Sequence, residues 1–227
     1  MLSAQDATFL LMPHKATIVN VDAEQLLGEW HPLVEQLGSS EGILPLASAS
    51  EMLSLPRVTN RASLTAFLET YKTQILIPVE LPAILQAFSH ADRHETRELI
   101  RFDQSLKQKM LMREFATASQ RVGCNQLRRL RPLRDHRLVQ RYLAAVEEKR
   151  ACGWHTLVFG VTLSIYSLPV RQGLVFYERQ TLRGFIDTAA NVLRLSLRES
   201  RQLLDQLLSD LPHDLDWMPE AGGWVTA

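Results

Sequence analysis

The spacing of apolar residues along the chain is the feature that most restricts its fold. From Leu64 onward, apolar side chains recur at intervals of three and four residues, and the first such set contains Leu64, Phe67, Leu68, Tyr71 and Ile75. This interval places the side chains along one face of an α-helix, whereas a half-buried strand alternates apolar and polar residues. Either Asn60 or Ser63 is expected to cap the amino terminus of this helix.

Prolines, glycines and capping residues predict where the helices begin and end. Pro78 is expected to end the first helix because its ring supplies no helical N–H, and Pro82 suits the first turn of the next, so a helical hairpin is implied. Asp92 is expected to cap a third helix, while Pro132 and Gly153 follow later ones. Further apolar sets at helical spacing lie within residues 99–106, 113–130, 139–146, 182–189 and 204–211.

Residues 157–165 are rich in β-branched side chains, so this segment is compatible with a buried strand as well as with a buried helix. Apart from a weak candidate over residues 17–21, no other strand is available to pair with it, and an isolated strand leaves backbone groups unpaired. We therefore predict a central apolar helix. The expected fold is all-α, a single-domain bundle of about eight to ten short helices around that helix.

The chain is expected to divide into three parts. Residues 1–21 form an irregular amino-terminal segment, residues 22–211 the all-helical domain, and residues 212–227 a flexible tail that contains aromatic residues. Solvated chain ends normally avoid large apolar groups. Trp217 and Trp224 are therefore predicted either to fold back on the core or to dock on another protein.

Charge and cysteine content exclude several classes of function. Lys and Arg number 25 and Asp and Glu number 25, so no overall field attracts nucleic acid or anionic lipid. Cys124 and Cys152 occur in no Cys-x-x-Cys spacing and are expected to be reduced and structural. The longest apolar run, residues 157–166, falls short of the ~20 residues that a membrane helix needs. The start lacks a basic signal region, so a cytoplasmic protein is expected.

Two clusters suggest ligand binding, and each has a structural interpretation that we prefer. His90 and His94 are four residues apart, as helical metal ligands often are, but Asp92 between them suits a helix cap and no third ligand is indicated. We therefore predict no metal and no cofactor. A basic run is compatible with phosphate contacts of a helical nucleic-acid-binding module, or with a solvated corner that pairs with Asp135, Glu147 and Glu148. The balanced overall charge favours the solvated-corner interpretation. The run comprises Arg128, Arg129, Arg131, Arg134, Arg137 and Arg141.

Catalytic motifs are absent from the sequence: it contains no phosphate-binding Gly-rich loop, no His-Glu-x-x-His and no Gly-x-Ser-x-Gly. The chain is therefore predicted to hold partner proteins rather than to catalyse a reaction. Several segments, taken in order between about Leu26 and Leu208, resemble the UreF family of urease accessory proteins. They are Arg57-Val58-Thr59-Asn60, Glu80-Leu81-Pro82-Ala83, Arg113-Glu114-Phe115 with Ser119 and Gly123, His155 with Val158-Phe159-Gly160, and Tyr177 with the apolar helix that follows.

Two segments depart from the family pattern. The family's Pro-Ile-Gly-x-Phe-Ser loop is shortened over residues 44–53 and has lost its glycines and aromatic residue. The family's Arg-Leu-x-Pro-Leu-Gly-Gln segment appears over residues 191–197 without its Pro, Gly or Gln. These losses leave open an alternative, an all-α interaction or regulatory protein unrelated to urease.

The resemblance implies an all-α accessory protein without enzymatic activity. Such a protein forms a homodimer, joins a UreD (also called UreH) scaffold and recruits the GTPase UreG. It thereby acts as a chaperone that helps nickel reach the urease apoprotein. Neither a membrane nor a nucleic acid is expected as a partner. The residues predicted to bind partners are Ser48, Glu51, Asn191, Arg194, Trp217, Met218 and Trp224.

Overall fold

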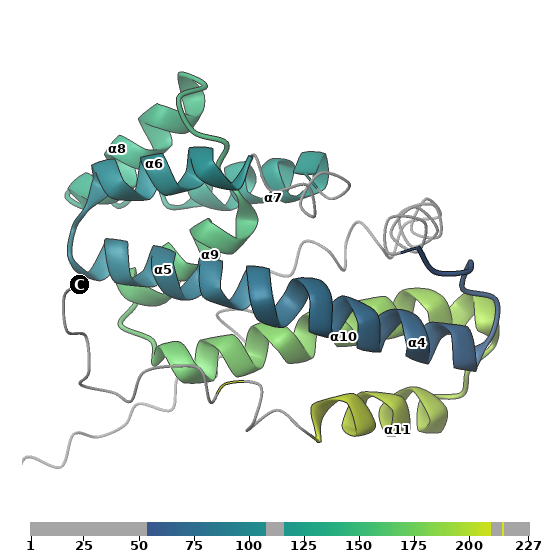
Figure 1. The fold of residues 1–227 in the computed structure, drawn as a ribbon. Helices are drawn as coiled ribbons and strands as arrows, with labels where there is room; N and C mark the ends of the chain where they lie inside the picture. Colours follow the sequence, from purple (N-terminus) through teal and green to yellow (C-terminus); the bar gives the residue numbers. More distant parts are fainter. Residues whose placement is uncertain (1–53, 108–115, 210–214, 216–227) are drawn as a thin grey trace, which may run out of the picture.

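A computed structural model describes residues 54–107, 116–209 and 215, and all regular structure in these ranges is helical. The prediction of an all-α fold is therefore confirmed for the described residues. The elements are α4 (Arg61–Tyr71), the π-helix η1 (Lys72–Glu80), α5 (Leu81–Asp92), α6 (Thr96–Leu106), α7 (Ala116–Arg129), α8 (Arg137–Glu147), α9 (His155–Ile165), α10 (Val170–Leu193) and α11 (Leu197–Leu208) (Figure 1).

The first three elements form one continuous helical rod from Arg61 to Asp92, so the predicted hairpin at Pro78 is wrong. Pro78 lies inside η1, where the wider turn accommodates a ring that would clash with an ordinary α-helical carbonyl. The N–H of Leu81 still donates to the carbonyl oxygen of Leu76, a π-type bond that spans five residues, and α5 begins at Leu81. Pro82 occupies the first turn of α5, as predicted.

The helix ends follow local capping chemistry at some positions and depart from the predictions at others. Asn60 caps α4 in a capping box, accepting from the Ser63 N–H at 2.9 Å, while Ser63 Oγ accepts from the Asn60 N–H at 3.1 Å. The predicted cap at Asp92 is wrong, because Asp92 ends α5 and Glu95 precedes α6. Helix α8 ends at Glu147, six residues before Gly153.

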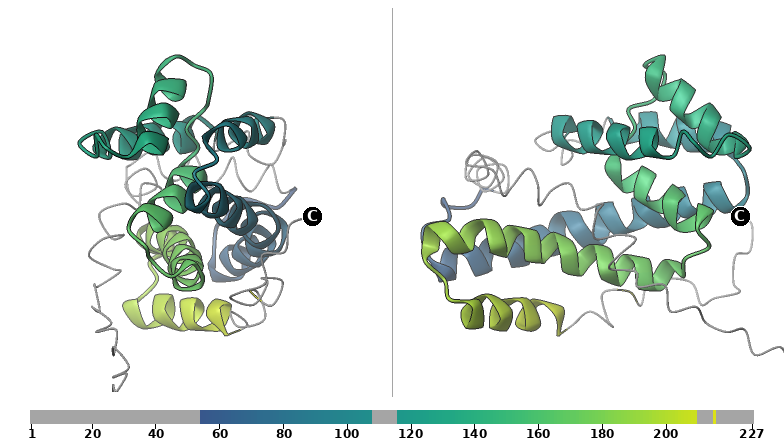
Figure 2. Two further views of the ribbon diagram at one scale, coloured as in Figure 1. Left: turned by 90° about the vertical axis from the view of Figure 1, so that its left-hand side faces the viewer. Right: turned by 180° about the vertical axis from the view of Figure 1, so that it is seen from behind.

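Helix α9 lies between two groups of helices. Helices α6, α7 and α8 gather on one side of α5 and α9, and α10 and α11 lie on the other (Figures 1 and 2). Every residue of α9 from His155 to Leu163 is buried, which resolves the ambiguous segment 157–165 as a helix. Its apolar character on all sides is what such an environment requires.

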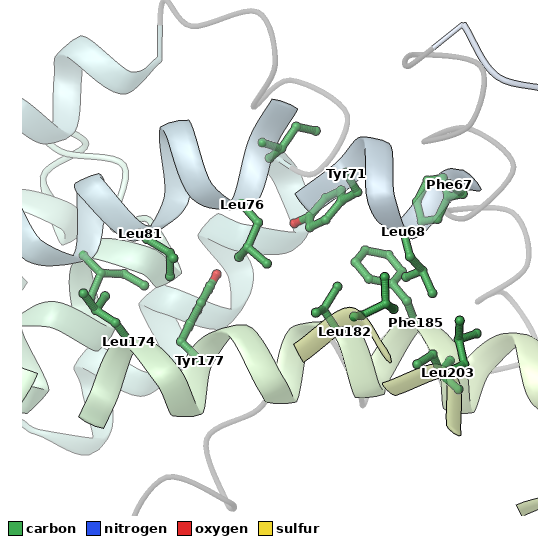
Figure 3. Close-up of a cluster of buried hydrophobic side chains, with 14 of the residues drawn as sticks. Phe67, Leu68, Tyr71, Leu76, Leu81, Leu174, Tyr177, Leu182, Phe185 and Leu203 are labelled. Carbon is green, nitrogen blue, oxygen red and sulfur yellow. The ribbon is translucent and has the colours of Figure 1, made fainter. Parts of the chain in front are cut away.

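Two core clusters hold these layers together. The first joins the α4–η1–α5 rod to α10 and α11, and its labelled members in Figure 3 are Phe67, Leu68, Tyr71, Leu76, Leu81, Leu174, Tyr177, Leu182, Phe185 and Leu203. The second lies among α5, α6, α7, α8 and α9 and includes Trp154, which is almost fully buried. Leu215, within the predicted tail, is fully buried in the first cluster.

Two glycines allow backbones to approach more closely than side chains permit. A Cβ on Gly160 would overlap the carbonyl oxygen of Ile84, where α9 crosses α5. A Cβ on Gly123 would overlap the carbonyl oxygen of Gly153 and lie 2.6 Å from the backbone nitrogen of His155. These contacts are with backbone atoms, which move only if whole segments separate.

Replacing Gly123 with alanine is expected to lower the free energy of unfolding by about 2 kcal/mol, measured by urea denaturation. The steric cost exceeds the helix-propensity gain of up to ~1 kcal/mol that alanine offers. Gly173→Ala is the matched control, because the three atoms nearest to its Cβ would be side-chain atoms of Leu163. Equal stabilities for the two variants would show that the α7 contact tolerates separation.

Candidate functional site

Exposed apolar side chains lie at the junction of α10 and α11. Among the described residues, the exposed large apolar side chains are Tyr166, Val192 and Leu197, with Val192 51% and Leu197 80% exposed. The last two lie on either side of the turn that joins the helices. Asn191 and Arg194, both predicted to bind partners, are exposed at the same corner. The structure thus places two predicted residues beside an apolar patch.

Local backbone chemistry fixes the shape of this corner. Arg194 ends α10 in the left-handed conformation, with a φ of 54°. Ser196 then caps α11 in a capping box, since the Ser196 N–H donates to Glu199 Oε2 at 2.9 Å and the Glu199 N–H donates to Ser196 Oγ at 3.3 Å. The Ser196 hydroxyl, which donates to Glu199 Oε2 at 2.7 Å, and then the Ser196 N–H lower the pKa of Glu199. Leu197 follows this cap as the first residue of α11, and its side chain is exposed to solvent.

A shallow groove of about 400 Å³ continues from this corner between α10 and α11. Its apolar lining is provided by Ile186, Leu197 and Leu204. The polar lining is mostly basic and consists of Arg179, Arg183, Arg201, Asp187 and Ser200. Arg183 pairs with Asp187 at 3.4 Å, whereas Arg179 and Arg201 form no ion pair within the described ranges.

Sequence reasoning found part of this surface and missed the α11 side. Leu197 is seven residues before Leu204 and eleven before Leu208, both of which pack against the core, so helical spacing alone groups it with the apolar face of α11. Its exposure follows from its place as the first residue of α11, which the apolar pattern does not indicate. The other predicted partner-binding residues, Ser48, Glu51, Trp217, Met218 and Trp224, lie outside the described residues.

His90 and His94 do not share one helical face. His90 Nδ1 lies 2.8 Å from Glu95 Oε2, which joins the end of α5 to the start of α6. His94 lies beyond α5 with a φ of 57°, and its ring is 6.1 Å from that of His136. Within the part of the chain that the structure describes, no three His, Cys, Asp or Glu residues come together as a metal site.

The basic run of residues 128–141 is divided among three elements. Arg128 and Arg129 end α7, Arg131 and Arg134 lie in the turn, and the rest lie on α8. Arg131 binds Glu147, as the solvated-corner interpretation predicted. Glu148, another predicted partner, is bound by Arg150 at 2.6 Å instead.

Buried polar groups link the helices in the interior. Glu80 is 6% exposed and accepts hydrogen bonds from the Tyr71 hydroxyl at 2.9 Å and the Tyr177 hydroxyl at 3.4 Å. Both hydroxyls are the termini of side chains that point between the rod and α10 (Figure 3). Burial raises the pKa of Glu80 to about 7, and the two tyrosine hydrogen bonds oppose that rise.

A second pair of buried charges lies next to this group on the same helices. Lys72 Nζ lies 3.5 Å from Glu178 Oε1 and donates to the carbonyl oxygen of Leu207 at 2.6 Å. Lys72 therefore connects η1 to both α10 and α11. These charges are enclosed in the first core cluster, so we assign them to the joining of helices.

The helical layers and the exposed α10–α11 corner define an all-α protein with a candidate protein-binding face. No helix among the described residues has the length and apolarity to cross a membrane. The family model of UreF matches residues 58–208, which is most of the chain. The chain therefore belongs to the UreF family of urease accessory proteins.

Individual relatives agree with this assignment. The urease accessory protein UreF of Actinobacillus pleuropneumoniae serotype 3 (strain JL03) is 25% identical over 173 residues, covering 73% of this chain and 76% of the relative. The UreF of serotype 5b (strain L20) is 24% identical over the same length and coverage. Because UreF proteins are non-catalytic accessory proteins, the chain is not an enzyme, as its sequence predicted.

Proposed function

We propose that this protein assists the insertion of nickel into urease, with the metal as cargo. It acts as a chaperone-like homodimer in the cytoplasm and assembles with a UreD/UreH-like scaffold, a UreG-like GTPase and the urease apoprotein. Family membership over residues 58–208 supports a role in urease maturation. The observation that carries the assembly role is the exposed α10–α11 corner, where Leu197 is 80% exposed.

The corner suits a protein partner with apolar residues flanked by carboxylates. Burying one Val or Leu side chain contributes about 1.5–3 kcal/mol, so Val192 and Leu197 together supply a useful share of binding free energy. Arg179 and Arg201 at the groove are available to carboxylates, and such rim charges set the rate and selectivity of association. We assign this face to the UreD/UreH-like scaffold.

Replacing both Val192 and Leu197 with aspartate is expected to reduce capture of the UreD/UreH-like partner at least tenfold, measured by pull-down from co-expressing cells. Both side chains are exposed, so folding is expected to change by only about 0.5 kcal/mol. Tyr166→Asp is the matched control, since it alters the other exposed apolar side chain of the described residues. Unchanged capture by the double variant would remove the corner from the interface.

A second pull-down, from native cells, tests the urease role itself. The wild-type chain, tagged and isolated from its native cells, is expected to retain a UreD/UreH-like or UreG-like protein. If it retains neither, then the proposed role in nickel insertion is wrong, whatever surface the chain uses.

A further inference from the structure

The chain's only two cysteines, Cys124 and Cys152, line one pocket of about 510 Å³. The pocket lies among the end of α6, helix α7 and the segment that follows α8, and its charged lining residues are basic (Figure 1). Cys124 Sγ lies 3.6 Å from the carbonyl oxygen of Cys152, to which the thiol donates. Both side chains are half-buried and both thiols are free, so a small molecule in the pocket reaches either sulfur.

The backbones that carry the two thiols touch at the neighbouring residues. A Cβ on Gly123, which precedes Cys124, would overlap the carbonyl oxygen of Gly153. A Cβ on Gly153, which follows Cys152, would lie 3.2 Å from Cys124 Sγ. A disulfide usually joins residues whose Cα atoms are about 4.4–6.8 Å apart, so it needs backbones that pass each other closely. The contact between the two glycine positions favours such a bond with α7 in its present place.

Hydrogen bonds hold both backbones in this position. Asp103 accepts from the Cys152 N–H and, at 2.9 Å, from the Gly153 N–H, so the segment before α9 is tied to α6. Ser119 Oγ on α7 accepts from the His155 N–H at 3.3 Å, which ties α7 to the start of α9. The thiols are therefore carried by two segments that keep their relative position. Rotation of the two side chains is the motion that brings the sulfur atoms together.

The surroundings of the two thiols decide which of them reacts first. Burial, followed by the charge of Asp103, raises the pKa of Cys152 to about 11. Burial also raises the pKa of Cys124, but the charge of Arg128 opposes that rise. Because the thiolate is the nucleophile in thiol oxidation, Cys124 is the first to react and Cys152 the second. Both thiols are mostly protonated at neutral pH, so their oxidation is slow.

We propose that Cys124 and Cys152 form a redox-sensitive pair, which a small peroxide converts into an intramolecular disulfide between α7 and the segment before α9. The Cys124 thiolate attacks one oxygen of hydrogen peroxide, the O–O bond breaks, and a sulfenic acid forms as hydroxide leaves. The Cys152 sulfur then attacks the Cys124 sulfur, the S–S bond forms, and the sulfenic oxygen leaves as a second hydroxide. The two thiol protons convert these hydroxides to water. Two thiols are thus oxidised by two electrons, and one peroxide is reduced to two waters.

The disulfide is expected to stabilise the fold. It closes a loop between two residues that are 28 positions apart, and the loop contains all of α8. Closing such a loop restricts the unfolded chain more than the folded one. The melting temperature of the oxidised chain is therefore expected to be higher by at least about 5 °C, and a reductant is expected to reverse the rise. Oxidation thus fixes α7 and α8 to the start of α9 until a reductant is supplied.

Hydrogen peroxide at millimolar concentration is the probe, applied to the full chain at pH 8 and then removed with catalase. The treated chain is expected to lose both free thiols, and its tryptic peptides with Cys124 and Cys152 are expected to appear as one linked species by mass spectrometry without reduction. Dithiothreitol is expected to separate the peptides and restore both thiols. The rate of linkage is expected to be independent of chain concentration, because the reaction occurs within one chain. No other protein is needed, so the outcome does not depend on the proposed role in urease maturation.

Cys124→Ser and Cys152→Ser are the matched controls, because each keeps one thiol in the same pocket. After the same treatment, the remaining cysteine is expected to gain oxygen or to link two chains, without a rise in melting temperature. The proposal would be overturned if the wild-type cysteines behaved in the same way, or if both thiols stayed free. A linked chain with an unchanged melting temperature would show that the bond does not fix α7 and α8.

Discussion

Replacing Asp103 with alanine is expected to lower the free energy of unfolding by about 4 kcal/mol, measured by urea denaturation. Asp103 is fully buried, and its carboxylate accepts from Tyr142 on α8 and from the backbone of Cys152 and Gly153 before α9. Alanine leaves all three donors without an acceptor, and each buried donor of this kind costs about 1–3 kcal/mol. One side chain of α6 thus fixes two neighbouring segments.

Tyr142→Phe separates the contribution of the tyrosine from that of the backbone. It removes the 2.6 Å hydrogen bond and leaves the two backbone donors bound, so a loss of about 1–2 kcal/mol is expected. If the two variants were equally stable, the backbone contacts of Asp103 would contribute nothing, and the role of Asp103 as an anchor would be wrong. The Trp154 indole N–H, which donates to the Asp103 backbone carbonyl at 2.9 Å, is retained in both variants.

The sequence predicted the helices well wherever one apolar face was clear. Helix α8 contains the predicted apolar set of residues 139–146, and its buried residues include Val139, Tyr142 and Leu143. The predicted helix boundaries were wrong where a local sequence rule was overridden by backbone geometry that the sequence does not reveal. Proline normally breaks a helix, but the π-turn of η1 lets the rod pass through Pro78.

The family resemblance identified motifs whose physical purpose only the structure reveals. Ser119 and Gly123 are one turn apart on α7, and both face the start of α9: Ser119 Oγ accepts from the His155 N–H at 3.3 Å, and Gly123 admits the backbone of Gly153. Gly160 of the Val158-Phe159-Gly160 segment likewise admits the backbone of α5. These pairings join segments far apart in sequence, so no local pattern predicts them.

The candidate sites show the same division between local and long-range information. Asn191 and Arg194 were found because they lie in a recognisable segment, whereas the α11 side of the groove depends on how that helix packs. The cysteines were predicted to be reduced, and both are free in the structure. Their meeting in one basic pocket results from the folding of α7 against the segment before α9.

Raising the pH from 5 to 8 is expected to remove about 3 kcal/mol of stability through Glu80 alone. Its pKa is about 7 in the folded protein, against an ordinary value of 4.5, because burial disfavours the charged form. Between these two values the folded state keeps a proton that the unfolded state has lost. Stability is therefore full below pH 4.5, falls as the pH rises, and reaches its lower level above about 7.

Glu80→Gln isolates this contribution, because the amide is neutral at every pH and its oxygen still accepts from Tyr71 or Tyr177. The difference in unfolding free energy between variant and wild type is expected to shift by about 3 kcal/mol in favour of the variant between pH 5 and pH 8. Lys72 and Glu178 remain in both proteins and cancel in the comparison. Parallel stability profiles would show that Glu80 is already ionised in the folded core, so that its tyrosine hydrogen bonds outweigh the cost of burial.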